Sequence, residues 1–211
     1  MRGITSIVVA ALVIGSLPSV SRAEDPVTFA DPNLQAAVEA ELGVSNPTPT
    51  DMLALTQLEA NEQGITELIG LEYAVNLKDV DLSFNQISDI SALTGLANLA
   101  NVNLAANQIT DISPFVGLTN LQQLGLTENQ ISDISALAGL MGLTYLNLRS
   151  NSLNAEAYVT YIPVIVANNP GLEIYYDPYG TVAVYRFWSP VYERHFYTTK
   201  ESEKDLSLIH I

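Results

Sequence analysis

Residues 77–96 read LKDVDLSFNQISDISALTGL, residues 99–118 read LANVNLAANQITDISPFVGL, and residues 121–140 read LQQLGLTENQISDISALAGL. A fourth copy begins at residue 143 as LTYLNLRSNSL. All four copies share the frame LxxLxLxxNxI, so that an asparagine recurs every 22 residues, at Asn85, Asn107, Asn129 and Asn151. A fixed period of this length predicts a stack of structural repeats in which neighbouring copies share one continuous core.

The pattern within one copy predicts its local structure. Apolar and polar residues alternate in LxxLxL, which is typical of a short strand, and repetition places such strands side by side in a parallel sheet. The asparagine follows at the bend, where we expect its amide to bind backbone groups left free by the turn. The DISAL and DISPF segments that return along the outer side are too short for a full helix, and one contains Pro114. We therefore expect extended or 3₁₀ structure on that side.

A small helical cap is expected before the repeats. Asp31 followed by Pro32 is a typical helix start, apolar residues then recur at helical spacing, and Gly43 is a typical helix end. A second helix start follows at residues 48–51, where an acidic residue comes three positions after a threonine, as in a capping box. We interpret residues 24–54 as the N-terminal cap, because the terminal units of a repeat stack must cover an otherwise bare core.

The repeats and a closing unit are predicted to span residues 55–178. The first copy is weaker and has Gln63 in place of the asparagine. The last copy changes after its asparagine: Asn154 is expected to cap a helix that Pro163 would kink. A turn at NNPG and a closing strand over residues 172–176 are expected to follow.

The first 23 residues are expected to be a secretory signal peptide rather than part of the fold. A positive start, an apolar run from Ile4 to Leu17 and small residues around Ala23 indicate cleavage after Ala23. An uncleaved membrane anchor is the alternative, but spanning a bilayer takes about 20 apolar residues. The predicted protein is therefore secreted or displayed at the cell surface.

Charge and cysteine content narrow the classes of protein further. The chain has 23 acidic and eight basic residues, and removing residues 1–23 would leave six basic ones and a net charge of −17. Such a surface repels nucleic acid and anionic lipid, so neither is expected as a partner. The chain has no cysteine, so the exported fold must be held by its core alone, which fits a bacterial protein.

The C-terminal end has a different composition. Residues 179–205 are rich in aromatic and β-branched residues and predict the start of a separate β-rich domain, with a hairpin turn near Ser189-Pro190. The last six residues, LSLIHI, correspond to the translation of a transposon-end sequence used in sequencing adapters. We expect residues 206–211 to be adapter rather than protein, and we exclude His210 from any metal or catalytic argument.

The repeats resemble those of bacterial leucine-rich repeat proteins of the internalin type, whose 22-residue units carry the NQISDISxLxGL signature quoted above. The segments DPNLQAAVEAELG and NAEAYVTYIPVIVANNPGLEIYYDP resemble the N-terminal cap and closing unit of related secreted proteins, so that the resemblance covers residues 27–178. It implies an α/β leucine-rich repeat solenoid with a concave parallel sheet and recognition of a protein or glycan at the cell surface. The segment YRFWSPVYERHFYTT resembles a tail domain of secreted bacterial proteins that has no settled activity.

The residues between the leucines of each strand are predicted to face outward and to form the ligand-binding surface. This surface is acidic at one end, rich in amides in the middle, and ends with Tyr145 and Arg149, which are frequent interface anchors. Carboxylates and amides suit polar ligands such as sugars or basic peptides. A solvated sheet face with no ligand is the alternative. The predicted ligand-binding residues are Asp79, Asp81, Asn101, Asn103, Gln123, Tyr145, Asn147 and Arg149.

No catalytic residue, metal site or cofactor is predicted. Asp79, Asp81, Ser83 and Asn85 imitate part of a calcium loop, but the required glycine and the final bidentate acid are missing. The chain has no GxSxG, HExxH or phosphate-binding glycine motif. His195 is interpreted as a packed or surface residue of a strand. The repeated aspartates 89, 111 and 133 are explained by the turns that they cap.

Three hypotheses for function remain open from the sequence. The first is an exported, non-catalytic and monomeric binding module that recognises a protein or glycan through its concave face. The second is the targeting arm of a larger secreted hydrolase, whose catalytic part would lie beyond residue 205. The third is cell-envelope scaffolding with no specific ligand.

Overall fold

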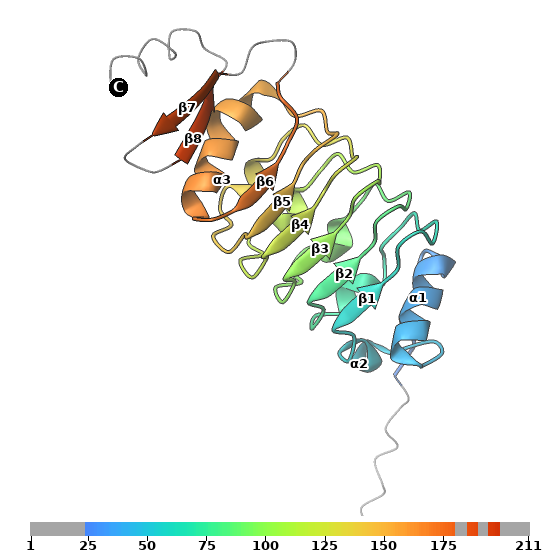
Figure 1. Cartoon of the computed structure of the whole chain (residues 1–211). Helices are drawn as coiled ribbons and strands as arrows, with labels where there is room; N and C mark the ends of the chain where they lie inside the picture. Colours follow the sequence, from blue (N-terminus) through green and yellow to red (C-terminus); the bar gives the residue numbers. More distant parts are fainter. Residues whose placement is uncertain (1–23, 180–184, 190–193, 199–211) are drawn as a thin grey trace, which may run out of the picture.

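The computed structural model describes residues 24–179 and two further strands, residues 185–189 and 194–198 (Figure 1). The predicted signal peptide and the predicted adapter sequence lie outside the described residues. Six short strands form one parallel sheet in chain order, each paired in register with the next. The strands are β1 (Gln57–Glu59), β2 (Asp79–Asp81), β3 (Asn101–Asn103), β4 (Gln123–Gly125), β5 (Tyr145–Asn147) and β6 (Glu173–Tyr175).

Short 3₁₀ helices form the opposite side of the stack, as the sequence predicted (Figure 1). They are η1 (Leu71–Tyr73), η2 (Ser91–Leu93), η3 (Ser113–Phe115) and η4 (Ser135–Leu137). A recurring aspartate caps each of the last three turns: the backbone N–H of Ser91, Ser113 and Ser135 donates to the carboxylate two residues before, at 2.8 Å. The repeated acids are therefore explained by local turn structure, which confirms that interpretation of residues 89, 111 and 133.

One continuous apolar core runs through the stack between the sheet and the 3₁₀ helices. It is built from the framework leucines and isoleucines of every repeat, nearly all of which are less than 5% exposed. In the repeat of β2, for example, Leu77, Val80, Leu82, Ile87 and Ile90 are all buried. Neighbouring repeats cover the flat faces that a single unit would leave in water, so burial of this apolar surface depends on stacking.

The recurring asparagines cross-link consecutive repeats through backbone hydrogen bonds. The Asn107 amide donates to the carbonyl oxygens of Leu82, one repeat earlier, and Leu104, at 3.0 and 3.1 Å. Its Oδ1 accepts the N–H of Ile87 at 2.9 Å. Asn85, Asn129 and Asn151 repeat this pattern. In the closing unit, Asn169 lies before β6 and joins the previous repeat at other positions: its Oδ1 accepts the N–H of Leu143, and its amide donates to the carbonyl oxygen of Leu140. Each side chain therefore replaces backbone partners that the turn cannot provide.

A second asparagine ladder was not predicted from the sequence. Asn76, Asn98 and Asn120 are also 22 residues apart, and each donates to a carbonyl oxygen of the previous repeat at 2.8 Å. Unlike the first ladder, this one is exposed and makes one such bond per side chain. The equivalent position in the next repeat is Gly142, which has no side chain to continue the ladder.

Every repeat also holds one non-glycine residue in the left-handed region. The backbone φ angles of Glu62, Phe84, Ala106, Glu128 and Ser150, each directly before the ladder position, lie between 54° and 56°. This conformation costs about 1 kcal/mol or more for a residue with a Cβ atom. The turn that places the asparagine therefore carries backbone strain in each repeat.

Helix α1 (Pro32–Leu42) and helix α2 (Pro49–Met52) close the N-terminal end (Figure 1). Both predicted helix starts are confirmed, and Gly43 ends α1 with a φ of 65°. Asp31 has a wider role than capping: its Oδ1 accepts the N–H of Asn33, while its Oδ2 accepts the N–H and Oγ–H of Thr66 in the first repeat. The cap is thus joined to the stack by one buried carboxylate.

At the other end, Asn154 caps a helix, and its Oδ1 accepts the N–H of Ala157 at 2.9 Å. The expected disturbance at Pro163 takes the form of a π-helical segment, η5 (Ala157–Tyr161), directly before α3 (Ile162–Asn168). The proline ring cannot donate a hydrogen bond and would clash with the carbonyl four residues earlier in a regular α-helix. Strand β6 follows as predicted.

Strands β7 (Tyr185–Ser189) and β8 (Arg194–Thr198) pair antiparallel. The assignment of residues 179–205 to a separate domain remains a prediction. In the described part of the chain, no helix has both the length and the apolar character needed to cross a bilayer.

Replacing Asn107 with leucine should destabilise the fold by about 3 kcal/mol or more, because one buried N–H and two carbonyl oxygens would lose their partner. Asn98→Leu is the matched control: it removes one exposed hydrogen bond of the second ladder and should cost less than about 1 kcal/mol. Urea denaturation of both variants measures the difference. Equal losses would contradict the distinct roles of the two ladders.

Asp31 should make stability depend on pH. Burial opposes its ionisation, but the hydrogen bonds from Thr66, Asn33 and Leu34 outweigh burial and hold the pKa of Asp31 below its usual value. The stabilisation is therefore present above the unfolded-state pKa of about 3.9 and is lost as the pH falls through the folded-state pKa.

Asp31→Asn should lower the free energy of unfolding at neutral pH by about 1–3 kcal/mol, because the new amide would present a donor to the donors of Thr66. The gap between the two proteins should narrow at acidic pH, and urea denaturation over a pH series measures it. Glu67→Gln, the same charge change at an exposed residue, is the control. A gap that is independent of pH would contradict the role of the carboxylate.

Candidate concave binding face

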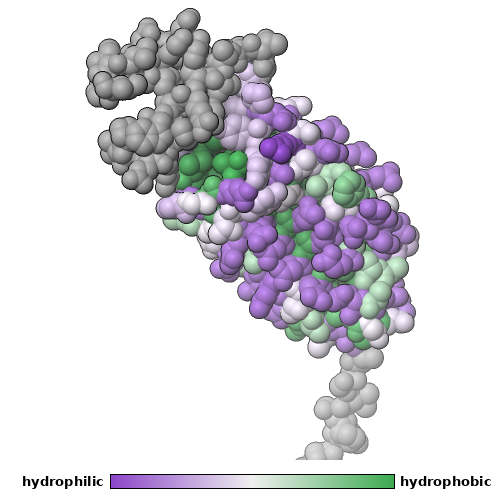
Figure 2. Space-filling model, viewed as in Figure 1, coloured by the Kyte–Doolittle hydropathy of each residue, from purple (hydrophilic) through white to green (hydrophobic). Residues whose placement is uncertain are grey.

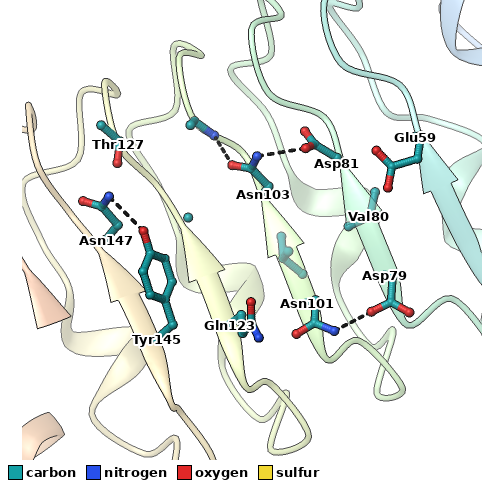
Figure 3. Close-up of a pocket in the computed structure, with 13 residues that line it drawn as sticks. Glu59, Asp79, Val80, Asp81, Asn101, Asn103, Gln123, Thr127, Tyr145 and Asn147 are labelled. Carbon is teal, nitrogen blue, oxygen red and sulfur yellow. Dashed lines mark hydrogen bonds between the residues drawn. The ribbon is translucent and has the colours of Figure 1, made fainter. Parts of the chain in front are cut away.

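An open groove of about 400 Å³ lies across the outward face of strands β1 to β5 (Figure 3). We call this surface the concave face; the residues that line it are Glu59, Asp79, Val80, Asp81, Asn101, Val102, Asn103, Ala105, Gln123, Gly125, Thr127, Tyr145 and Asn147. Seven of the eight predicted ligand-binding residues are therefore brought together. Arg149, the eighth, follows β5 at the end of the groove. In the same view as Figure 1, mostly hydrophilic residues cover this side (Figure 2).

The sheet register explains how residues 22 positions apart become neighbours. Asp79 pairs with Asn101, and Asn101 with Gln123, so that side chains of the same repeat position form a row across the strands. Adjacent strands lie about 4.8 Å apart. At this spacing, polar side chains on the same face of neighbouring strands can reach one another and form hydrogen bonds. Periodicity thus converts a repeated sequence position into a continuous surface.

Two hydrogen bonds join the acidic end of the concave face to its amide-rich middle (Figure 3). The Asn101 amide donates to the Asp79 carboxylate at 2.5 Å, and the Asn103 amide donates to the Asp81 carboxylate at 3.0 Å. The Oδ1 of Asn101 is buried and accepts no hydrogen bond from the described residues. These amides are consequently held in one orientation by their acidic neighbours.

The Asn103 side chain occupies the space that a side chain at position 125 would need. A Cβ atom there would come within 2.8 Å of the Asn103 Oδ1, so that any larger residue would displace the amide. The ring of Tyr145 stands on the next strand, and its hydroxyl oxygen accepts a hydrogen bond from Asn147 at 3.1 Å (Figure 3). Gly125 therefore gives room to the Asn103 amide on the strand next to that of Tyr145.

The far end of the face has an aromatic residue that the sequence analysis did not include. Tyr175 on β6 lies next to Asn147 in the register, and its ring centroid is 5.9 Å from that of Tyr145. The Arg149 guanidinium lies over the Tyr175 ring, 4.6 Å from its centroid, within cation–π range. The sequence analysis predicted a closing strand over residues 172–176. It did not assign Tyr175 to the binding surface, because these residues match the repeat frame only weakly.

Ser83, two residues after Asp81, is not available to a ligand. Ser83 is only 4% exposed, and its hydroxyl donates to the Asp81 Oδ1 at 2.6 Å. The close bond to a neighbouring carboxylate covers the serine, so it supports Asp81 instead of contributing to the surface. The ladder asparagines Asn85, Asn107 and Asn129 are also buried, and they contribute no binding surface.

A second hollow, of about 520 Å³, lies on the 3₁₀ side and includes Asp89 and Asp111. Both carboxylates accept hydrogen bonds from their own turns. Within residues 24–179 and the two C-terminal strands, no group of three or more histidine, cysteine, aspartate or glutamate residues is placed to share a metal ion.

Comparison with known proteins identifies the same type of repeat. Leucine-rich repeat family models match residues 97–153 and, for a pair of repeats, residues 75–117. The structure of an internalin C2 from Listeria monocytogenes is 34% identical, with a TM-score of 0.52; the match covers 71% of this chain and 75% of that one. This chain belongs to the internalin family of leucine-rich repeat proteins.

Two further solved structures share the leucine-rich repeat fold. Another Listeria monocytogenes internalin, InlF, is 25% identical with a TM-score of 0.56, covering 78% of this chain and 56% of that one. A leucine-rich repeat protein of Leptospira interrogans is 25% identical with a TM-score of 0.51, covering 59% and 32% of the two chains. The internalin-like chain thus spans little more than half the length of InlF. No curated protein gives a significant match.

Proposed function

We propose that this internalin-like chain is an exported, monomeric, non-catalytic module that binds a protein or glycan of a cell surface through its concave face. The observation that carries the proposal is the groove itself: a continuous surface of polar side chains from five strands that the core does not need. Outward positions of a strand tolerate almost any polar residue, whereas here the amides and carboxylates of neighbouring strands form hydrogen-bonded pairs.

The chemistry of the concave face suits a polar ligand. Carboxylates and amides offer both acceptors and donors, and the rings of Tyr145 and Tyr175 offer apolar surface that loses little conformational freedom on binding. Tyrosine and arginine are also the residue types in which binding energy concentrates at protein interfaces. The end of the face formed by Tyr145, Arg149 and Tyr175 is therefore the expected anchor.

Binding should be lost when the anchor is removed or the groove is filled. On arrays of glycans and peptides, Tyr145→Ala should weaken binding of any captured ligand about tenfold or more, since a tyrosine hot spot contributes about 2 kcal/mol. Asn103→Arg should abolish binding by placing a long side chain in the groove beside Gly125.

Two substitutions on the opposite side of the stack provide matched controls. Tyr73→Ala removes an exposed tyrosine of η1, and Thr94→Arg adds the same long side chain at an exposed position after η2. Both should leave binding unchanged. A ligand that all four variants retain, or that the controls also lose, would contradict recognition by the concave face.

A further inference from the structure

The N-terminal half of the concave face has an uncompensated negative charge. Glu59 and Asp81 are direct partners in the register of β1 and β2, and Asp79 lies on the same face of β2. Like charges directly opposite each other in a sheet are destabilising. Asn101 and Asn103 donate hydrogen bonds to the two aspartates but bring no positive charge.

No cationic side chain lines the groove among the described residues. Residues 24–179 contain 19 acidic side chains and two basic ones, Lys78 and Arg149. Lys78 precedes β2 and is not part of the groove. Arg149 follows β5, three strands from β2, which corresponds to about 14 Å at the usual strand spacing and exceeds the screening length of about 8 Å at physiological salt. This half of the face therefore has a negative potential that a cationic ligand would complement.

An exposed aromatic residue follows strand β2 closely in the chain. Phe84 comes three residues after Asp81, is 59% exposed, and has a φ of 56°. An exposed phenylalanine gains nothing from burial in the free protein, and a bulky residue in the left-handed region is strained. The backbone N–H of Phe84 is fixed by the carbonyl oxygen of Ala105 at 2.8 Å, so the ring projects from a rigid support.

We infer that the N-terminal half of the concave face, formed by Glu59, Asp79 and Asp81, docks an extended basic segment of a partner protein, and that the exposed Phe84 takes part in this contact. This inference rests on the proposed function and assigns a ligand class to one half of the same surface. Charge complementarity selects the occupant. It also excludes acidic glycans and acidic peptides from this half of the face.

Spacing favours an extended chain over a compact cation. Asp79 and Asp81 are two residues apart on one strand, about 6.7 Å at the rise of a β-strand. Alternate side chains of an extended peptide have the same spacing, so lysines or arginines at every second position match the two carboxylates. Phe84 can then receive the aliphatic stem or the cationic end of a further basic residue.

The test uses the full chain and a fluorescein-labelled peptide in which lysine alternates with serine, followed by fluorescence anisotropy. A peptide with glutamate in place of lysine is the ligand control. The lysine peptide should bind and lose affinity as salt is raised, whereas the glutamate peptide should not bind.

Two charge-matched double variants locate the site. Asp79→Asn with Asp81→Asn should weaken binding of the lysine peptide about tenfold, as expected for the loss of two ion pairs that are partly open to solvent. Asp89→Asn with Asp111→Asn changes the net charge equally on the 3₁₀ side and should change affinity less than about twofold. Equal weakening in both would show attraction by net charge alone and would overturn the inference.

Phe84 provides a test in which stability and binding change in opposite directions. Phe84→Gly should raise the unfolding temperature, because glycine accepts the left-handed backbone, and should weaken peptide binding about twofold to fivefold. Ala106→Gly relieves the same conformation one repeat later, where φ is 54°, and should raise stability with binding unchanged. Phe84→Gly with unaltered affinity would remove Phe84 from the site.

The outcomes also separate this inference from the proposed function. If neither peptide binds, or both bind alike, the basic-segment assignment fails. A ligand from the arrays that Tyr145→Ala loses would still support recognition by the C-terminal half of the concave face. If that ligand is also absent, the proposed function fails with it.

Discussion

The cross-link between repeats by the buried asparagines is the interaction on which the rest of the structure depends. Each repeat turns from strand to 3₁₀ side without enough local backbone partners, and one side-chain amide provides both a donor and an acceptor there. Because half of these bonds reach the previous repeat, the turn and the stacking contact form together. The repeats therefore gain stability only as a stack, which agrees with a core that is shared between neighbours.

Fixing the turn also fixes the binding surface. Once the asparagine holds the register, equivalent outward positions of successive strands must lie in rows, and each row can differ in chemistry at no cost to the core. The strain at Glu62, Phe84 and Ala106 belongs to the same turn. Phe84 shows that this turn position accepts a large apolar side chain, so the residue type there can vary with function.

Much of the fold was predictable because the signals are local and repeated. The frame LxxLxLxxNxI, the helix caps at Asp31 and Thr48, and the closing strand near Glu173 each follow from short-range pattern and turn chemistry. The π-helical segment before Pro163 was predicted only as a kink, since the choice among helical distortions depends on packing at the end of the stack. The exposed ladder at Asn98 was missed because its spacing is hidden beside the stronger buried one.

The sequence by itself determined the repeat architecture, the inward role of Asn85 and its equivalents, and which side chains face outward, because these depend on period and alternation. Only the tertiary structure decided how the outward residues combine. It placed Tyr175 beside Tyr145 and under Arg149, and it packed the Asn103 amide against Gly125. These outcomes depend on distances between strands that are 22 or more residues apart in the chain, which no local pattern specifies.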